Sequence, residues 1–146
     1  MAATRRKAGP AISTEVYLNN LTDQSFSLLD KKDWWGTGKP PVNVPALQTR
    51  YFMQLADSYK GYSEGGLVFV VKDDIKWVVA WSNILDQDNK VYTEITKKDS
   101  VDWDKIKQQL ELSGSHAQVT NEGYKSTVDI DPYSVTPNMN AKLEEP

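Results

Sequence analysis

The sequence predicts a mainly β protein, an antiparallel β-sandwich with one flanking amphipathic α-helix. Three observations predict this fold: short runs of alternating apolar and polar residues recur, clusters of Asp, Asn and Gly separate them, and one segment has apolar residues at helical spacing. With 146 residues and no cysteine, the chain has the length of one domain and needs no disulfide to bury a core. We expect one sandwich domain over residues 14–146 and a disordered basic tip over residues 1–13.

Alternating runs dominate the N-terminal half. TEVYLNN from Thr14 and QSFSLL from Gln24 are expected to form the first strands, and LQTRYFMQLA at residues 47–56 alternates most clearly. Because successive side chains of a strand point to opposite faces, one face of this run carries the odd-numbered positions and the other carries the even-numbered ones. The odd-numbered face is the more apolar, so we expect it to face the core and the other face to meet solvent.

The centre of the sandwich is predicted at residues 65–71, GGLVFVV, where a continuous apolar run is typical of a strand covered on both faces. A tight, aspartate-containing turn then leads into KWVVAWSN at residues 76–83. Alternation places Trp77 and Trp81 on one face with Val79, which predicts a core position for Trp77. Trp81 lies near the end of the strand, where it fits either a structural corner or a pocket wall.

Three further strands are expected in the C-terminal half, at residues 91–96, 124–130 and 139–145. One helix interrupts them, over residues 101–112, because Trp103 and two aliphatic residues recur at helical intervals. Asp99 or Ser100 is expected to cap its start. So short a helix is marginal alone, so its apolar stripe must lie on the sheets.

The longest stretch without a regular pattern is DWWGTGKPPVNVP at residues 33–45, in which two glycines and three prolines exclude an ordinary strand interior. Loops of this length often carry function. Neighbouring side chains in an extended segment point in opposite directions, so Trp34 is expected to turn inward and Trp35 outward. An outward Trp35 can stack on a sugar or enter a lipid interface. The alternative is that both rings pack down as a lid.

A second aromatic group, Tyr59 and Tyr62, flanks a predicted loop in DSYKGYSEGG. If this loop and the one that carries Trp35 share an end of the sandwich, they form an aromatic shelf for a sugar or lipid head group, with cation–π contact to choline. Trp81 and Asn83, at the end of the central strand, are the remaining candidate ligand-binding residues. The alternative for both tyrosines is partial cover of the surface.

Charge and hydropathy argue against several classes of function. The formal net charge is −3, and without Arg5, Arg6 and Lys7 the remaining 14 basic residues face 20 acidic ones, a charge of −6. Such an acidic body argues against a nucleic-acid partner. No apolar segment is long enough to cross a membrane, and the N-terminus lacks the apolar region of a secretory signal. We expect a cytoplasmic or nuclear protein.

Enzymatic and metal chemistry finds little support in the sequence. His116 is the single histidine, without the local Ser or Asp arrangement of a catalytic triad. The run DQDNK begins like a calcium loop but has Lys90 at a ligand position and lacks the glycine that should follow. The run WWGTGKPP lacks the spacing of a phosphate-binding loop. No cofactor or metal is therefore expected.

Four short motifs follow one another along the chain: DWWG at residues 33–36, AWSN at residues 80–83, YTEI at residues 92–95 and VDWDKI at residues 101–106. On these motifs the chain resembles the jasmonate-induced proteins of plants, which are small stress-responsive proteins. That family is similar, more distantly, to actinoporin-like cytolysins and a fungal sphingomyelin-binding protein. The likeness implies two packed sheets with a flanking helix, and lipid head groups or glycans as ligands. The short basic N-terminus does not fit a pore-forming helix.

The leading hypothesis is a non-enzymatic stress- or defence-related binding protein of the jasmonate-induced type, with a lipid head group or glycan as ligand and peripheral membrane contact. Its expected ligand-binding residues are Trp35, Tyr59, Tyr62, Trp81 and Asn83. One alternative is a self-associating or protein-interaction stress protein that forms a homo-oligomer through aromatic loops or a strand edge. The other is an enzyme that uses dispersed carboxylates and tyrosines on a small molecule.

Overall fold

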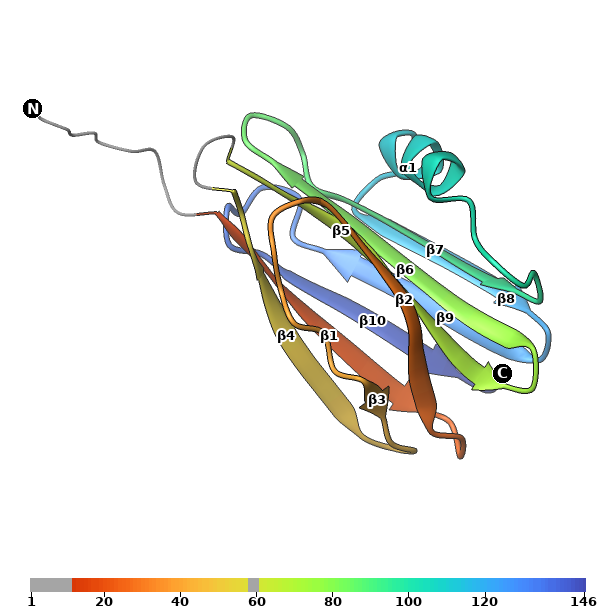
Figure 1. The fold of residues 1–146 in the computed structure, drawn as a ribbon. Helices are drawn as coiled ribbons and strands as arrows, with labels where there is room; N and C mark the ends of the chain where they lie inside the picture. The colour runs from red at the N-terminus through yellow and green to blue at the C-terminus, as the bar shows by residue number, and fades with distance from the viewer. Residues whose placement is uncertain (1–11, 58–60) are drawn as a thin grey trace, which may run out of the picture.

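The structure, a computed structural model, describes residues 12–57 and 61–146. In these residues two five-stranded sheets pack face to face, and one helix lies on the outside of one sheet (Figure 1). The mainly β sandwich predicted from alternation and turn chemistry is confirmed. The predicted tip lies outside the described residues as far as residue 11. Its expected boundary is corrected, since Ile12 is buried and the first strand already begins at Ser13.

The first sheet has the strand order β4-β1-β10-β9-β8. Its strands are β1 (Ser13–Leu21), β4 (Thr49–Leu55), β8 (His116–Asn121), β9 (Tyr124–Ile130) and β10 (Asn138–Glu144). All neighbours are antiparallel except β1 and β10, which run parallel. The first sheet is therefore mainly antiparallel, as predicted, with one parallel pair because β10 enters the sheet beside β1 and from the same end.

The second sheet has the strand order β3-β2-β5-β6-β7, and all its neighbours are antiparallel. Its strands are β2 (Phe26–Trp35), β3 (Asn43–Val44), β5 (Tyr62–Lys72), β6 (Ile75–Ile84) and β7 (Lys90–Thr96). The two central strands form the predicted hairpin. Its turn contains Asp73, whose positive φ of 53° is a conformation that aspartate tolerates in turns.

The core lies between the two sheets and includes both central tryptophans. Trp77 is fully buried, and its ring meets that of Phe26 edge-on at a centroid separation of 5.5 Å. The Nε1 of Trp77 donates a hydrogen bond to the Ser126 hydroxyl at 2.7 Å, so burial leaves no unpaired donor. The predicted core position of Trp77 is confirmed.

The segment expected to be an irregular loop begins as a strand instead. β2 continues to Trp35, and β3 occupies two residues further on. The pairing of β2 with β5 shifts register between Leu28 and Asp30 and again between Asp33 and Trp35. Such shifts are typical of β-bulges, which insert an extra residue without ending the strand. The strand therefore persists where the alternation in the sequence is broken.

The faces of β4 are the reverse of the predicted ones. Tyr51, Met53 and Leu55 are 61%, 42% and 56% exposed, whereas Phe52 and Gln54 point into the core. The ring of Phe52 packs edge-on against a buried tryptophan at 5.9 Å. The Gln54 side chain is hydrogen-bonded at both its oxygen and its nitrogen, so its burial carries little penalty. We call Tyr51, Met53 and Leu55 the β4 apolar face.

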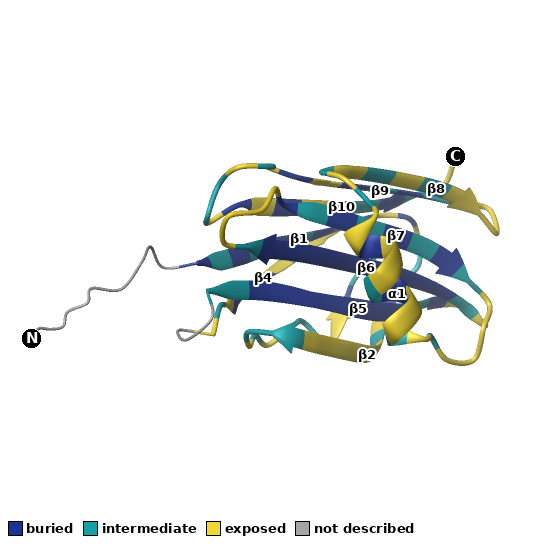
Figure 2. Ribbon diagram, turned by 90° about the horizontal axis from the view of Figure 1, so that it is seen from above, coloured by how far each residue is buried: buried dark blue, intermediate teal, exposed yellow. Residues whose placement is uncertain are grey.

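The helix α1 (Trp103–Glu111) covers the outer face of the second sheet, over β5, β6 and β7 (Figure 2). Its buried Ile106 and Leu110 pack with apolar residues of β5 and β6. Trp103 meets Trp34 edge-on at a centroid separation of 5.7 Å. Trp34 is half-buried on the outer face of the second sheet, beneath the helix, so the expectation that it turns into the sandwich is corrected.

The start of the helix differs slightly from the prediction. Asp102 is the N-cap, and its carboxylate accepts hydrogen bonds from two backbone N–H groups of the first turn. Asp99 and Ser100, the expected caps, precede it. No helix in the described residues is long and apolar enough to cross a membrane.

Candidate functional site

One end of the sandwich, which we call the loop end, gathers connections from both sheets (Figure 1). They are the described parts of residues 36–42, 56–61, 85–89, 112–115 and 131–137. Strand pairing brings them together, because Trp35 at the end of β2 pairs with Glu64 near the start of β5, and Tyr62 pairs with Ile84 at the end of β6. Trp35 and the start of β5 at Tyr62 therefore lie at one end of the sandwich, which is the condition for a shared aromatic shelf.

An aromatic pair lies at the loop end. The rings of Trp35 and Tyr62 meet edge-on, with centroids 5.4 Å apart and planes at 85°. Both side chains are half-buried, so each ring packs on its neighbour and still meets solvent. Such a pair presents a large apolar surface with polar tips, the combination found in side chains at membrane interfaces. Tyr59 lies outside the described residues.

A hollow of about 310 Å³ lies beside this pair, between the β6–β7 and β9–β10 connections. We call it the loop-end hollow. Its lining includes Leu85 and Tyr133, which are 38% and 80% exposed, and two acidic residues, Asp86 and Asp88. Ile84 lines it as well and connects it to the aromatic pair through its pairing with β5. The hollow therefore joins exposed apolar side chains to negative charge.

Two buried asparagines hold the β9–β10 connection in place. Asn83 donates its side-chain amide to the carbonyl oxygens of Ser13 at 3.1 Å and Val135 at 3.3 Å. Asn89 donates to the carbonyl oxygens of Asp131 and Ser134, each at 2.8 Å. These bonds occupy the Asn83 amide with backbone groups, and Asn83 also lines the loop-end hollow, so its contact with a ligand stays a prediction. Asn89, which no pattern in the sequence marks, positions the same connection and lines the hollow as well.

Trp81 belongs to the core and not to the surface of the loop end. Only 1% of the residue is exposed, and its Nε1 donates to Gln54 Oε1 at 2.8 Å. Of the two roles that the sequence allows for Trp81, a structural corner or a pocket wall, the structure supports the structural one. This corrects the prediction that Trp81 contacts a ligand.

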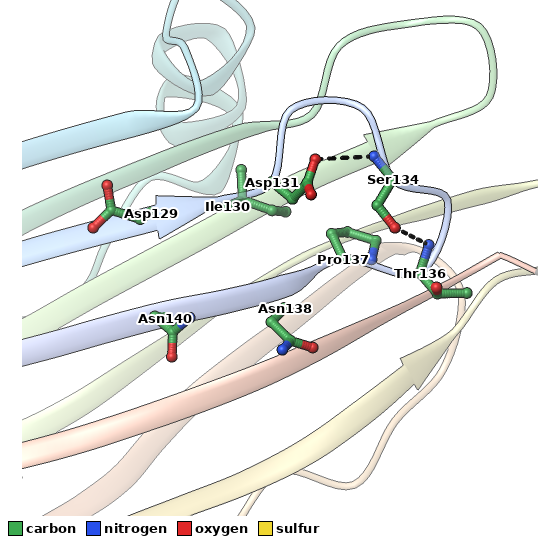
Figure 3. A pocket seen from close by; sticks show the side chains of 8 residues that line it. All are labelled: Asp129, Ile130, Asp131, Ser134, Thr136, Pro137, Asn138 and Asn140. Carbon is green, nitrogen blue, oxygen red and sulfur yellow. Dashed lines mark hydrogen bonds between the residues drawn. The ribbon is translucent and has the colours of Figure 1, made fainter.

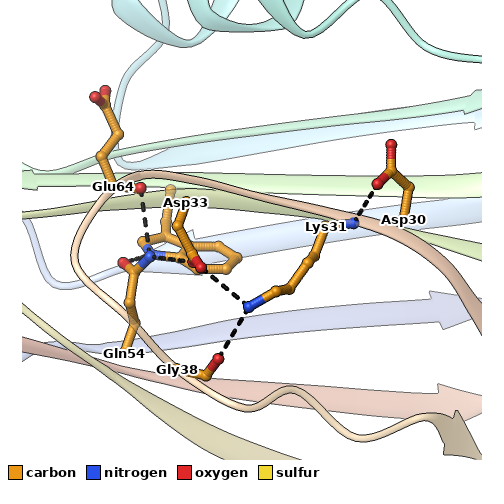
Figure 4. Close-up of polar contacts among 7 residues, drawn as sticks. Asp30, Lys31, Asp33, Gly38, Gln54 and Glu64 are labelled. Carbon is orange, nitrogen blue, oxygen red and sulfur yellow. Dashed lines mark hydrogen bonds and ion pairs between the residues drawn. The ribbon is translucent and has the colours of Figure 1, made fainter.

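A network of hydrogen bonds and one ion pair links the strands next to the loop end (Figure 4). Gln54 Oε1 also accepts from the Ser63 hydroxyl at 2.7 Å, and Gln54 Nε2 donates to Asp33 Oδ1 at 3.0 Å. The other carboxylate oxygen of Asp33 pairs with Lys31 Nζ at 3.0 Å, and this ammonium group donates to the carbonyl oxygen of Gly38 at 3.2 Å. The network connects β2, β4, β5 and β6 with the connection that follows Trp35.

Glu64 is the most unusual charged residue near this end. It lies on the helix side of β5 with 1% of its surface exposed, and neither carboxylate oxygen has a hydrogen-bond partner in the described residues. Its nearest cation is Lys107 of α1, with Nζ 3.9 Å from Oε1. Burial raises the pKa of Glu64 above its usual value of 4.5, and the positive charge of Lys107 opposes part of that rise.

The geometry offers little for catalysis or metal binding. Among the described residues, no group of three or more His, Asp or Glu side chains is placed to hold a metal ion. His116 is the first residue of β8, on the edge strand of the first sheet, with its Nδ1 2.5 Å from Asp129 Oδ1 and both side chains exposed. What the loop end presents is an apolar, aromatic surface with acidic neighbours, which suits binding.

The fold and the loop end together define a class: small two-sheet β-sandwich proteins with an outer helix and aromatic loops at one end. Within that class, the chain belongs to the Nakanori-like protein family, whose model matches residues 1–145. It is also similar to a jasmonate-induced protein homolog of Atriplex canescens, 27% identical over 131 residues, which cover 80% of this chain and 70% of that protein. The resemblance inferred from the four short motifs is confirmed.

Solved structures with little sequence identity show the same fold. The lipid binding protein Nakanori is similar with a TM-score of 0.82 and 14% identity, covering 94% of this chain and 73% of that one. The lectin of Xerocomus chrysenteron is similar with a TM-score of 0.64 and 16% identity, covering 91% of this chain and 100% of that one. The more distant link to actinoporin-like cytolysins stays a prediction.

Proposed function

We propose that the protein is a non-enzymatic lipid-binding protein that docks its loop end on a membrane and recognises a zwitterionic head group. The observation that carries the proposal is the gathering of Trp35, Tyr62, Leu85 and Tyr133 at one end, each at least partly open to solvent. Membership of the Nakanori-like family supports it, as does the fold shared with a lipid binding protein and a lectin.

The charges at the loop-end hollow favour a cationic group on the ligand. Asp86 and Asp88 line the hollow together with Tyr133, whose ring is open to solvent. A quaternary ammonium group is attracted both by carboxylates and by the face of a tyrosine ring. The net charge of −3 gives the chain no general attraction to anionic lipids. We therefore expect binding to choline lipids, such as sphingomyelin, rather than to phosphatidylserine.

Sedimentation with liposomes tests this proposal. The full chain is expected to sediment with liposomes that contain sphingomyelin or phosphatidylcholine, and Tyr133→Ala is expected to weaken the partitioning about tenfold, the effect of losing about 1.4 kcal/mol of apolar burial. Leu21→Ala is the matched control, because Leu21 is an exposed apolar residue at the end of the sandwich opposite the loop end, where β1 ends. Equal loss in both variants, or no sedimentation of the wild type, would overturn the proposal.

Self-association is a second candidate function, favoured by the β4 apolar face. Its three residues lie on an edge strand of the first sheet, where exposed apolar side chains are typical of interaction surfaces. Light scattering at increasing protein concentration tests this candidate. A rise in mean mass that Met53→Lys abolishes would support it, and a constant monomer mass would remove it.

We further propose a stress or defence role in the cytoplasm or nucleus of a plant cell. The similarity to a jasmonate-induced protein homolog of Atriplex canescens supports the role, and the absence of cysteine fits a reducing compartment. Fractionation of plant tissue with an antibody against this chain tests the location. Recovery of the protein from the extracellular fluid alone would contradict it.

A further inference from the structure

A second hollow, of about 460 Å³, lies on the outer face of the first sheet (Figure 3). We call it the sheet-face hollow. The β9–β10 connection separates it from the loop-end hollow, and Ser134 lines both. Most of its lining is polar, with carboxylate, amide and hydroxyl side chains from Asp129, Asp131, Ser134, Thr136, Asn138 and Asn140. The helix covers the other sheet (Figure 2), and the exposed Asp129, Asn138 and Asn140 leave this face open to solvent.

Much of the hydrogen-bonding capacity of this lining is unused. The side-chain amides of Asn138 and Asn140 are exposed and make no hydrogen bond with the described residues. Asp131 Oδ1 accepts from the backbone N–H groups of Tyr133 and Ser134, which leaves its other oxygen free. Asp129 likewise uses one oxygen on His116. The hollow thus offers amide donors beside carboxylate acceptors, the pattern that a hydroxyl group can satisfy as acceptor and donor at once.

An aromatic surface lies directly beside these polar groups. The pairing registers place Tyr51, Tyr17, Asn140, Asp129 and His116 in one row across the sheet. Directly opposed side chains in adjacent strands are about 5 Å apart at Cβ, so Tyr17 flanks the hollow at Asn140. The Tyr17 and Tyr51 rings stack, with centroids 5.4 Å apart and planes at 18°. Tyr51 is exposed and Tyr17 is half-buried, so the stacked pair offers aromatic surface to the C–H face of a ring.

The lining is held in place before any ligand arrives. The buried asparagines Asn83 and Asn89 fix the backbone of the β9–β10 connection from beneath. The backbone N–H of Glu15 donates to the carbonyl oxygen of Pro137 at 3.0 Å and ties the far side of this connection to β1. Because the loop is already ordered, binding pays little conformational entropy.

From these observations we propose that the sheet-face hollow binds a neutral sugar ring, from either a free glycan or a glycolipid head group. Two carboxylates, Asp129 and Asp131, disfavour an anionic ligand. A metal ion fits poorly, since the described residues contain no group of three or more His, Asp or Glu side chains placed to hold one. Mixed donors and acceptors beside a flat aromatic surface match a ring with hydroxyl groups on its edge and an apolar face. The site does not depend on the lipid site proposed at the loop end.

A glycan array followed by calorimetry tests the proposal. The full chain is expected to bind neutral glycans on the array, and calorimetry with the free oligosaccharide of the strongest response then measures affinity. Asn140→Ala and Tyr17→Ala are each expected to reduce that affinity about tenfold or more. Tyr17→Phe is the matched control, because it keeps the stacked ring, and its affinity should stay close to the wild type. Circular dichroism checks that every variant is folded.

A silent array, or an affinity that neither Asn140→Ala nor Tyr17→Ala changes, would overturn the sugar site. Liposomes that carry a neutral glycosphingolipid distinguish the two sources, because a glycolipid receptor gives stronger binding there than to the free oligosaccharide. Equal binding assigns the site to free glycans. Tyr133→Ala should leave sugar binding unchanged, and Asn140→Ala should leave binding to sugar-free choline liposomes unchanged. Failure of one site is thus distinguishable from failure of the other.

Discussion

Gln54 hydrogen-bonds the side chains of Trp81, Ser63 and Asp33, and an apolar replacement would leave the buried Trp81 Nε1 without its acceptor. Substitution Gln54→Leu keeps the size of the side chain but removes the acceptor for Trp81 Nε1 and the donor to Asp33. We expect the free energy of unfolding, measured in urea, to fall by about 1–3 kcal/mol, the usual cost of buried groups left unsatisfied. Gln48→Leu is the control, because Gln48 is exposed, and its change should stay within about 0.5 kcal/mol. Equal urea midpoints for Gln54→Leu and the wild type would contradict this role of Gln54.

Glu64 gives the stability of the protein a specific pH dependence. Its folded pKa is raised above the usual 4.5, so folding penalises the charged form. The resulting loss of unfolding free energy is absent below the unfolded pKa. It grows as the pH rises from the unfolded pKa to the folded pKa. Glu64→Gln stays neutral throughout, so its stability relative to the wild type should improve between about pH 4 and about pH 8. Urea unfolding at both pH values measures the difference.

The Glu64 comparison has a clear contrary outcome. Other titrating groups are shared by the two proteins and cancel in the difference between them. A difference in unfolding free energy that does not change with pH would show that the carboxyl group titrates normally in the folded protein. Lys107→Met is a second check, because removal of the cation that opposes the rise should raise the pKa of Glu64 further.

At some single residues, alternation along a strand is enough to predict burial. Trp77 lies mid-strand on an apolar face, and the structure buries it there. A position near a strand end predicts a ligand site for Trp81 and Asn83, yet both are buried. Their partners, the Gln54 oxygen and the carbonyl oxygens of distant segments, are brought to them only by the tertiary fold. No local signal in the sequence marks such partners.

At the scale of elements, β4 shows that a count of apolar residues does not always choose the buried face. Phe52→Ala should lower the free energy of unfolding by about 3–5 kcal/mol, because it removes a buried ring. Met53→Lys, on the exposed face, should change it by no more than about 0.5 kcal/mol. Thermal or urea unfolding measures both. A larger loss for Met53→Lys than for Phe52→Ala would restore the orientation predicted from the sequence.

The start of α1 provides a second test at this scale. Asp102→Ala removes the acceptor for two backbone N–H groups and should cost about 0.5–2 kcal/mol in the free energy of unfolding. Asp99, which the sequence equally favoured as a cap, makes no such bond, so Asp99→Ala should be close to neutral. Urea unfolding of both variants separates the two positions. The reverse order of effects would place the helix start earlier.

Elements with strong patterns were predictable and weak ones were not. The helix is predictable because Trp103 and two aliphatic residues repeat at helical spacing, and the central hairpin because apolar runs flank an aspartate-containing turn. The sequence does not predict β8 and β3. β8 has only Ala117 and Val119 as apolar residues, and β3 is only two residues long. Short or polar strands are stabilised by their neighbours in the sheet, which a single segment does not reveal.

At the scale of the whole molecule, function depends on which connections meet. The β9–β10 connection stands between the loop-end hollow and the sheet-face hollow, and β10 reaches its place by a parallel pairing that no local pattern predicts. Aromatic loops could be recognised in the sequence, but their meeting at one end follows from topology. The sheet-face row from Tyr51 to His116 likewise exists only because four pairing registers align.

The central claim is that the loop end is the part of the molecule that meets the lipid. The cysteine-free chain allows a direct test, in which an environment-sensitive dye is attached to Gln87→Cys at the loop end or to Asp74→Cys at the opposite end. On addition of sphingomyelin liposomes, the dye at position 87 should shift its emission to the blue while the dye at position 74 stays unchanged. An equal shift at both positions, or a shift at position 74 alone, would contradict the account.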